Sequence, residues 1–387
     1  MDIRELDKKY VANTYNRFPP VLVRGKGARF WDEDGKEYVD FGSGIGVNSF
    51  GAADEEWKAA VTAQLDKLQH TSNLYYTEPC VKLAAALCEK TGMKRVFFGN
   101  SGAEANECAI KTARKWAFDK YGDESHSTVI TLKSSFHGRT LATLAATGQD
   151  VFHTKFGPFP EGFAYADAYD PAELEALAAK GSACAVMIEC IQGEGGVNVL
   201  TQDFVSAAAA ICDKYGLLLV CDEVQTGNGR TGKYFCYMNY GVTPDIVTTA
   251  KGLGGGLPIG ACLLGERVAD TLDAGSHGST FGGNPVSCAG ALSVVERLTD
   301  GFLAEVAAKG EYIRKRLTDA GIEAEVSGMG LMLGITCSKP LAEASAACIE
   351  NGLLVLTAKT KLRLLPPLNI TMDELSDGMD RLIAALK

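Results

Sequence analysis

Residues 217–222, Leu-Leu-Leu-Val-Cys-Asp, form a continuous apolar run that ends on a carboxylate. A strand buried on both faces has this pattern, because the helices of an α/β protein cover both sides of a parallel sheet. Comparable runs occur along the same part of the chain, at 94–98, 127–132 and 183–188. Helical patterns separate them, at 105–121 and 203–215. The predicted fold class is therefore α/β, with a helix-covered parallel sheet.

The pattern of apolar residues and turn signals changes on both sides of this region. Turn signals and short alternating segments in residues 1–50 predict a small antiparallel meander. From residue 285 a long helical segment continues through Leu317, and short strands and a last helix from Asp373 follow it. We predict a large domain over 51–284 and a smaller α+β domain over 285–387, with segment 1–50 packing against the smaller domain.

Composition and charge narrow the classes of function. The 38 basic and 48 acidic residues give a net charge of -10, and the absence of a dense basic run argues against a nucleic-acid partner. The charged start does not resemble a signal peptide, and no apolar run has the length of a membrane span. The 12 cysteines are scattered without zinc spacing, so we expect reduced thiols, no metal and a cytoplasmic protein.

A second informative stretch is 245–258, Asp-Ile-Val-Thr-Thr-Ala-Lys-Gly-Leu-Gly-Gly-Gly-Leu-Pro. It carries Lys251 from a β-type run into a glycine-rich loop that lacks the G-x-G-x-x-G spacing of dinucleotide sites. A lysine that is partly desolvated can use its neutral amine to form an imine with an aldehyde. Taken alone, the segment fits a solvated lysine at a strand end equally well.

Asp222 stands at the carboxyl end of the run at 217–222, where open α/β sheets bind ligands. A buried carboxylate needs a cation or hydrogen-bond donors, and a protonated pyridine nitrogen would serve. A metal ligand or a capped loop is the alternative for this residue.

Residues 100–104, Asn-Ser-Gly-Ala-Glu, follow a predicted strand and open a long helix. Ser101 and Glu104 have capping-box spacing, which could serve only to start the helix. The amino end of a helix also offers N–H groups and a favourable dipole to a phosphate. An aldehyde, a ring nitrogen and a phosphate are the three groups of pyridoxal phosphate (PLP) that Lys251, Asp222 and this helix would bind.

The order of the motifs resembles that of the class III (ornithine-type) aminotransferases, which depend on PLP. The matching segments are 100–107, 135–140, 192–196, 222–232, the Lys251 loop and 277–285, within a resemblance that runs from 23 to 367. The resemblance implies the PLP-dependent transferase fold type I, with a mostly parallel seven-stranded sheet in the large domain and a smaller α+β domain. It also implies a homodimer whose subunits share their active sites.

By the same resemblance Lys251 is the catalytic residue that holds PLP as a Schiff base, and Asp222 pairs with the ring nitrogen. Ring contacts are expected from Phe136, which stacks on the ring, and from His137, Glu223 and Gln225. Phosphate contacts are expected from Ser101, Gly102, Ala103 and the other subunit's Thr280. For Glu223 strand alternation favours the opposite face, so a structural role is the alternative.

Two arginines in matching motifs, Arg139 and Arg363, are expected to bind the carboxylates of the substrates. A guanidinium can donate two parallel hydrogen bonds to one carboxylate. In the family's pattern Glu194 pairs with the second arginine in one half-reaction and releases it in the other. Within the class, the motifs are most similar to the branch that transfers the amino group of N2-acetylornithine to 2-oxoglutarate. The products there are N-acetylglutamate 5-semialdehyde and glutamate, in arginine biosynthesis.

Substrate choice stays open at this stage. Ile45 stands where relatives that act on free ornithine tend to carry an aromatic, and Tyr15 and Ser279 are expected substrate neighbours. Succinylornithine, succinyldiaminopimelate, ornithine and 4-aminobutyrate are alternative donors. An isomerase or decarboxylase of the same fold would not need two arginines to bind substrate carboxylates, so Arg139 and Arg363 argue against it. A non-catalytic nucleotide-binding module would not need the pairing of Lys251 with Asp222.

Three positions depart from the family's pattern. Residues 51–54, Gly-Ala-Ala-Asp, replace a common Gly-His-x-His stretch, Cys190 stands where proline is usual, and Asn228 replaces a small apolar residue. None of them belongs to the predicted catalytic set.

Overall fold

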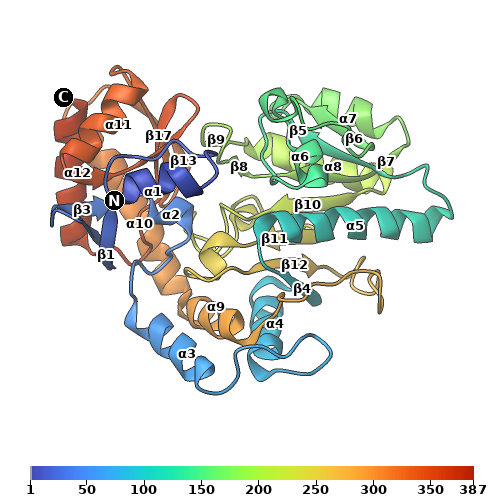
Figure 1. Ribbon diagram of the computed structural model, residues 1–387. Helices are drawn as coiled ribbons and strands as arrows, with labels where there is room; N and C mark the ends of the chain where they lie inside the picture. The colour runs from blue at the N-terminus through green and yellow to red at the C-terminus, as the bar shows by residue number, and fades with distance from the viewer. Residues whose placement is uncertain (1) are drawn as a thin grey trace.

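A seven-stranded sheet forms the centre of the computed structural model, which describes residues 2–387 (Figure 1). Its strand order is β4 (Arg95–Gly99), β12 (Gly260–Leu264), β11 (Ile246–Thr249), β10 (Leu218–Asp222), β7 (Ala183–Ile188), β5 (Thr128–Leu132) and β6 (Phe163–Ala166). Only β12 runs antiparallel to its neighbours. Every residue of β7 and β10 is buried, as their continuous apolar sequences require. The prediction of a mostly parallel α/β sheet is confirmed.

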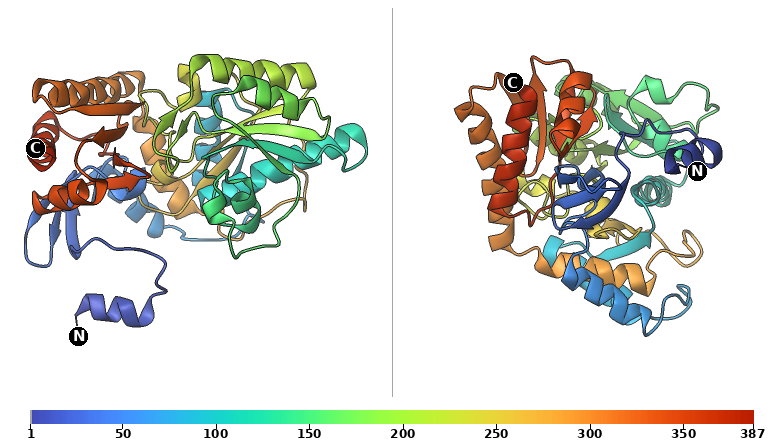
Figure 2. Two further views of the ribbon diagram at one scale, coloured as in Figure 1. Left: turned by 90° about the horizontal axis from the view of Figure 1, so that it is seen from above. Right: turned by 60° about the vertical axis from the view of Figure 1, so that its left-hand side comes forward.

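Helices cover both faces of this sheet. The long helix α5 (Gly102–Tyr121) packs on β11 and β12, and α8 (Gln202–Tyr215) lies on the opposite face (Figure 2, left). The other helices near the sheet are α3 (Glu55–Leu65), α4 (Glu78–Thr91), α6 (Leu141–Ala146), α7 (Pro171–Ala178) and α9 (Pro285–Arg297). Short elements complete this part: α2 (Ser43–Gly46), β8 (Ile191–Gln192), β9 (Asn198–Val199), η1 (Asp150–Phe152), η2 (Cys236–Asn239) and η3 (Lys251–Leu253).

The C-terminal part contains a second sheet, in the order β13 (Ala324–Met329), β14 (Met332–Cys337), β17 (Lys361–Leu364) and β16 (Leu356–Ala358). Its helices are α10 (Asp300–Asp319), α11 (Leu341–Glu350) and α12 (Met372–Leu386). The helical segment expected from 285 to 317 is two helices, because Leu298 leaves the helical conformation and Thr299 caps a new helix through its side chain.

The N-terminal strands β1 (Leu22–Lys26), β2 (Arg29–Asp32) and β3 (Glu37–Asp40) form an antiparallel meander, as the turn signals predict. The strand β15 (Leu353–Leu354) pairs with β3 in parallel and joins the two ends of the chain in one sheet. Helix α1 (Ile3–Tyr10) buries no residue, and Arg4 joins it to the meander through an ion pair with Glu33 at 2.7 Å. Among residues 2–387, no helix has the length and hydropathy needed to cross a membrane.

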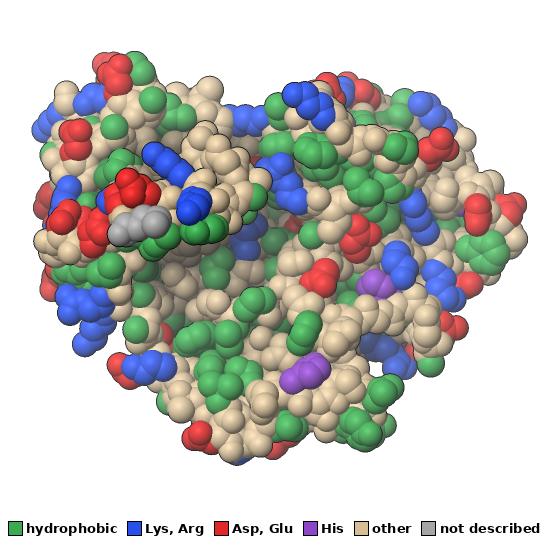
Figure 3. Space-filling view, viewed as in Figure 1, with side chains coloured by type: hydrophobic (Ala, Val, Ile, Leu, Met, Phe, Trp, Pro, Cys, Tyr) green, Lys and Arg blue, Asp and Glu red, His purple; other side chains and the backbone are tan. Residues whose placement is uncertain are grey.

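One face of the molecule carries a group of exposed hydrophobic side chains around the segment between α3 and α4. We call this group the apolar patch. Figure 3 shows hydrophobic side chains gathered on the lower part of this face. The patch consists of Leu68, Leu74, Tyr75, Tyr76 and Phe281, with Tyr76 fully exposed. Large exposed patches of hydrophobic side chains are a common feature of protein–protein contact sites.

Arg230 is the largest fully buried side chain and lies where the central and C-terminal parts meet. Its guanidinium donates to the carbonyl oxygens of Leu331, at 3.3 Å, and of Pro366. Its own carbonyl accepts from the Leu331 N–H at 2.9 Å. Burial lowers the pKa of Arg230 to about 9, against the opposing effect of Asp40, so the group stays charged at pH 7.

The backbone of the turn at Gly330, next to Arg230, leaves no room for a side chain at Gly310 of α10. A Cβ atom added to Gly310 would lie 2.2 Å from the carbonyl oxygen of Gly330, whereas one added to Gly301 in the same helix would meet nothing within 4 Å. We expect Gly310→Ala to lower the free energy of unfolding by roughly 1–3 kcal/mol, because the turn carrying Gly330 must shift. Differential scanning calorimetry would measure this as a lower Tm.

Gly301→Ala is the matched control. Because alanine favours helix and meets no clash, it should leave stability unchanged or raise it by up to about 1 kcal/mol. Equal Tm values for the two variants would contradict the close packing of α10 on this turn.

Candidate active site

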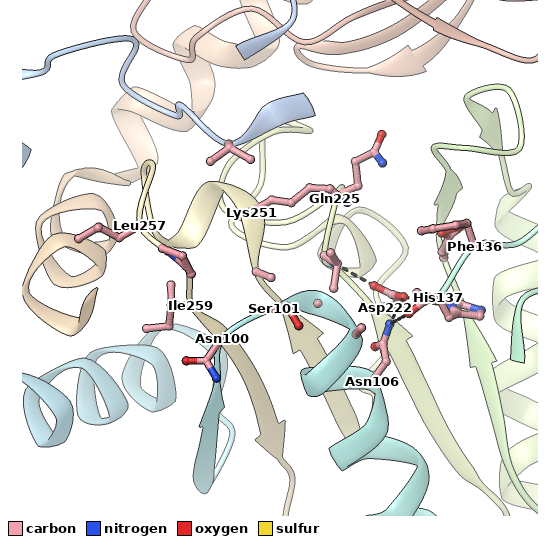
Figure 4. Close-up of a pocket in the computed structure, with 18 of the residues that line it drawn as sticks. Asn100, Ser101, Asn106, Phe136, His137, Asp222, Gln225, Lys251, Leu257 and Ile259 are labelled. Atoms are coloured by element: carbon pink, nitrogen blue, oxygen red, sulfur yellow. Dashed lines mark hydrogen bonds and ion pairs between the residues drawn. The ribbon is translucent and has the colours of Figure 1, made fainter. Parts of the chain in front are cut away.

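A cavity of about 370 Å³ opens at the carboxyl ends of the central strands (Figure 4). It is lined by the start of α5, the loop after β5, the end of β10 and the turn that contains Lys251. Of the predicted site residues, those that line it are Ser101, Gly102, Ala103, Phe136, His137, Asp222, Gln225 and Lys251. The position agrees with the general rule for ligand sites of open α/β sheets.

The carboxylate of Asp222 is buried and held by three donors. Its Oδ2 accepts from Asn106 Nδ2 and lies 2.8 Å from His137 Nδ1, while Oδ1 accepts from the Val224 N–H at 3.0 Å. His137 Nδ1 is the donor, because an ionised carboxylate can only accept. Such donors replace the water that a buried carboxylate loses. The group can therefore stabilise a cation that enters the cavity, such as a protonated pyridine nitrogen.

The open alternative for Asp222, a metal ligand, has one feature in its favour. Side-chain atoms of His137, Glu189 and Asp222 lie within 4.8 Å of one another. The two closest of them, His137 Nδ1 and Asp222 Oδ2, are however already bonded to each other. We therefore retain the ring nitrogen as the partner of Asp222.

The start of α5 has the geometry of a phosphate site. Ser101 caps the helix by accepting from the Glu104 N–H at 3.2 Å, and the Glu104 carboxylate accepts from the Asn100 N–H. A Cβ added to Gly102 would lie 2.6 Å from the Val224 side chain, and one added to Gly260 on β12 would lie 2.1 Å from the Ser101 carbonyl oxygen. Glycine at both positions lets neighbouring segments approach closely, and Gly102 and Ala103 in the first turn line the cavity.

Lys251 lies in the short helical turn η3 directly after β11, and its side chain extends into the cavity (Figure 4). Its φ of 44° is left-handed, which costs about 1–3 kcal/mol for a residue other than glycine. Desolvation lowers the pKa of Lys251, against the opposing effect of Asp222 and two nearby glutamates. The neutral amine needed for imine chemistry is thus more accessible than in a solvated lysine.

Arg363, Glu194 and Gln225 form a closed triangle at the cavity. Arg363 Nη1 donates to Glu194 Oε1 at 2.5 Å and to Gln225 Oε1 at 2.9 Å, and Gln225 Nε2 donates to Glu194 Oε1 at 3.1 Å. Burial acts to raise the pKa of Glu194, but the Arg363 guanidinium outweighs it and the pKa is lowered. The amide of Gln225, expected at the ring oxygen, is engaged with this ion pair.

Three polar residues that line the cavity were not among the predicted site residues: Asn100, Asn106 and Glu189. Asn106 lies one helical turn after the 100–104 motif and bonds both Asp222 and the His137 carbonyl. Glu189 follows β7, and burial together with Asp222 raises its pKa well above the usual range. The same strand-end rule that selects Asp222 would have selected Glu189.

Other predicted residues lie outside the cavity of their own chain. Glu223 points away, and its carboxylate accepts from Thr226 Oγ1 and from the N–H groups of Cys236 and Tyr237. It anchors the loop after β10 instead of contacting the cavity, which fits the structural alternative. Arg139 is exposed, with its guanidinium 5.3 Å from the centre of the Phe136 ring.

The remaining candidates lie on more exposed segments. Thr280 is exposed, and Ser279 Oγ lies 3.3 Å from the Asn100 amide. Tyr15 is on the N-terminal segment, with 71% of its surface exposed. Ile45 has a left-handed φ of 67° in the turn α2, two residues before Val47 at the cavity wall.

Comparison with known proteins identifies the family. The model of the class III aminotransferases matches residues 10–386. The acetylornithine aminotransferase of Haemophilus ducreyi is 52% identical over 386 residues, which cover 99% of this chain and 98% of that protein. The acetylornithine aminotransferase of Methanocaldococcus jannaschii is 44% identical over 394 residues, with coverage of 99% and 98%.

Solved structures agree with this result. The ornithine aminotransferase of Toxoplasma gondii, which has partial occupancy of PLP at its active site, superposes with a TM-score of 0.94. It is 33% identical, with 99% of this chain and 93% of that chain covered. The N-acetylornithine aminotransferase of Stenotrophomonas maltophilia gives a TM-score of 0.85 at 38% identity, with coverage of 99% and 98%.

The residues of the cavity fit PLP at each of its three groups. Asp222 offers a carboxylate acceptor for the ring nitrogen, the start of α5 offers N–H groups for the phosphate, and Lys251 offers an amine for the aldehyde. The chain belongs to the class III aminotransferases, and pyridoxal phosphate is its cofactor.

Proposed function

We propose that the chain transfers the terminal amino group of N2-acetylornithine to 2-oxoglutarate and so serves arginine biosynthesis. The relatives with this activity in their names support the choice of donor, at 43–52% identity over nearly the whole chain. The observation that carries the proposal is the Arg363–Glu194 pair beside the cavity, because the two substrates differ in charge next to the reacting amine.

The difference in charge follows from the chemistry of the substrates. Glutamate has a carboxylate on the carbon that bears its amine, whereas the reacting carbon of acetylornithine has none. Glu194 neutralises Arg363 while acetylornithine is in place, and its release frees the guanidinium for the carboxylate of glutamate or 2-oxoglutarate. Arg139, which has no ion-pair partner among residues 2–387, is the second proposed carboxylate contact.

The cofactor, when bound, supplies an electron sink for the charge that develops at the reacting carbon. Lys251 Nζ removes the proton from that carbon and delivers it to the cofactor side, as general base and then general acid. Asp222 would accept a hydrogen bond from the protonated ring nitrogen, and Phe136 would lie against the ring. Ser101, Gly102 and Ala103 hold the phosphate through the first turn of α5.

A homodimer with shared sites is the second part of the proposal. Thr280 is exposed next to the apolar patch and does not line the cavity of its own chain, so we propose that it reaches the phosphate of the neighbouring subunit. Ser279 is proposed as a substrate neighbour. The exposed Tyr15 is proposed as a substrate neighbour in the same assembly. The 12 free cysteines support a reducing location, the cytoplasm.

Donor choice is tested by a panel of amino donors assayed with 2-oxoglutarate. N2-acetylornithine should give the highest kcat/KM, ahead of succinylornithine, succinyldiaminopimelate, ornithine and 4-aminobutyrate. A higher value for any of the others would replace the proposed donor. Decarboxylation or isomerisation without 2-oxoglutarate would point to the other reaction classes.

The role of Lys251 has a direct chemical test. Borohydride reduction of the cofactor-loaded protein should add the mass of the reduced cofactor to the peptide that contains Lys251, because reduction fixes an imine as a stable amine. Peptide mass spectrometry detects the addition. Lys251→Ala is the control, and cofactor mass on a different lysine would rule out this assignment.

The charge switch predicts opposite effects for its two partners. Arg363→Ala should lower kcat/KM for glutamate by roughly 10- to 100-fold more than for acetylornithine, since it removes a charged hydrogen-bonding partner. Glu194→Gln should impair acetylornithine turnover by about tenfold and spare glutamate, because Arg363 is then never neutralised. Half-reactions followed by cofactor absorbance measure both. Equal losses for the two substrates in both variants would exclude the switch.

Shared sites predict complementation between two inactive variants. Lys251→Ala removes the amine, and Thr280→Glu places a negative charge against the phosphate. A mixed dimer would have one doubly damaged site and one intact site, so unfolding and refolding the two together should restore activity. Gel filtration verifies that each variant is dimeric. No recovery in verified mixed dimers would mean that each site is built from a single subunit.

A further inference from the structure

The turn that contains Lys251 is held by side chains from three distant parts of the sequence. Asn228 Nδ2 donates to the carbonyl oxygen of Ala250 at 3.2 Å, Ser49 Oγ to that of Gly252 at 2.9 Å, and Trp57 Nε1 to that of Gly254 at 3.0 Å. Every second carbonyl along the turn is thus fixed from outside. A backbone held in this way can keep a conformation that it would otherwise leave.

Asn228 is the member of this group that acts immediately before Lys251. Its amide nitrogen bonds Thr249 Oγ1 at 2.8 Å as well as the Ala250 carbonyl, so both amide hydrogens are used. The orientation of the amide is fixed, because a carbonyl oxygen can only accept. The side chain is buried, and its Oδ1 has no partner among residues 2–387.

Lys251 needs such support because its φ of 44° is left-handed. The Ala250 carbonyl accepts from Asn228 and also from the Leu253 N–H at 2.9 Å, so loss of the asparagine removes one of its two donors. The peptide before Lys251 is then restrained less firmly, and so is the place of the amine in the cavity. Small displacements of a reacting group cause large losses of reactivity.

Asn228 could also be present only because its own backbone is left-handed. Its own φ is 55°, and asparagine is one of the residues that tolerate a left-handed turn. If the turn were the only reason, glycine would serve as well, because it has no Cβ to clash. The two hydrogen bonds across to the end of β11 have no place in that explanation.

We propose that Asn228 is a positioning residue that holds the Lys251 turn in its left-handed conformation. The proposal rests on the proposed role of Lys251 as the lysine that binds the cofactor aldehyde. It gives a physical role to a position where this chain departs from the family's pattern: a small apolar residue there has no amide to donate.

Asn228→Gly tests the proposal, since it keeps the left-handed turn and removes only the amide. Equilibrium dialysis of the cofactor-free protein would measure the Kd of two ligands. Pyridoxal phosphate reacts with Lys251, whereas pyridoxamine phosphate has no aldehyde and uses only the ring and phosphate contacts. We expect pyridoxal phosphate to bind on the order of tenfold more weakly, with pyridoxamine phosphate within about twofold of wild type.

Asn228→Asp provides a second variant that also tolerates the turn. Its carboxylate would face the Ala250 carbonyl oxygen, so pyridoxal phosphate should bind more weakly still than to Asn228→Gly. Ser49→Ala, on the other side of Lys251, is the comparison for general loosening. The Tm of each cofactor-free variant establishes that it is folded.

The outcomes separate this inference from the proposed function. If Lys251→Ala binds pyridoxal phosphate as tightly as wild type, the role of Lys251 itself is wrong. If Lys251→Ala binds it weakly and Asn228→Gly binds it as wild type does, Asn228 is a turn residue only. Equal weakening of both ligands in the Asn228 variants would indicate a structural role and overturn the proposal.

Discussion

The burial of the Asp222 carboxylate is the constraint on which the site depends. An ionised group inside a protein is costly unless donors surround it, and here they come from three separate segments. Asn106 belongs to α5, His137 to the loop after β5, and the Val224 N–H to the loop after β10. Satisfying one carboxylate therefore brings together the segments that line the cavity.

The same convergence explains why the site tolerates little change in its backbone. Gly102 packs against Val224, and Gly260 lies close to the Ser101 carbonyl, so the start of α5 is packed tightly against both the loop after β10 and strand β12. Arg363 extends from the C-terminal sheet to Glu194 and Gln225 and completes the opposite wall. This ion pair thus links the C-terminal part of the chain to the cavity.

Sequence patterns were sufficient for the architecture and for the main chemical groups. Continuous apolar runs identify strands such as β7 and β10, and the rule that ligands bind at strand ends selects Asp222 and Lys251. The break between α9 and α10 was missed, because Leu298 and Thr299 carry no strong stop signal and the helical pattern continues across them.

Within the site, the residues that escaped prediction act through contacts between distant segments. Asn106 lies on a helix among residues of similar polarity, and only the fold brings its amide to Asp222. Glu189 was overlooked although it follows a buried strand as Asp222 does. Thr280 and Tyr15 are candidates that a single chain leaves outside its own cavity, so their roles stay predictions.

The most direct test of the account is the protonation state of the cofactor ring nitrogen, which Asp222 is argued to control. Cofactor labelled with nitrogen-15 in the ring can be bound to the protein and observed by NMR. We predict that the ring nitrogen of the bound cofactor is protonated throughout the neutral pH range, and that it loses this proton in the Asp222→Ala variant. A ring nitrogen that is unprotonated in the wild-type protein at neutral pH would contradict it.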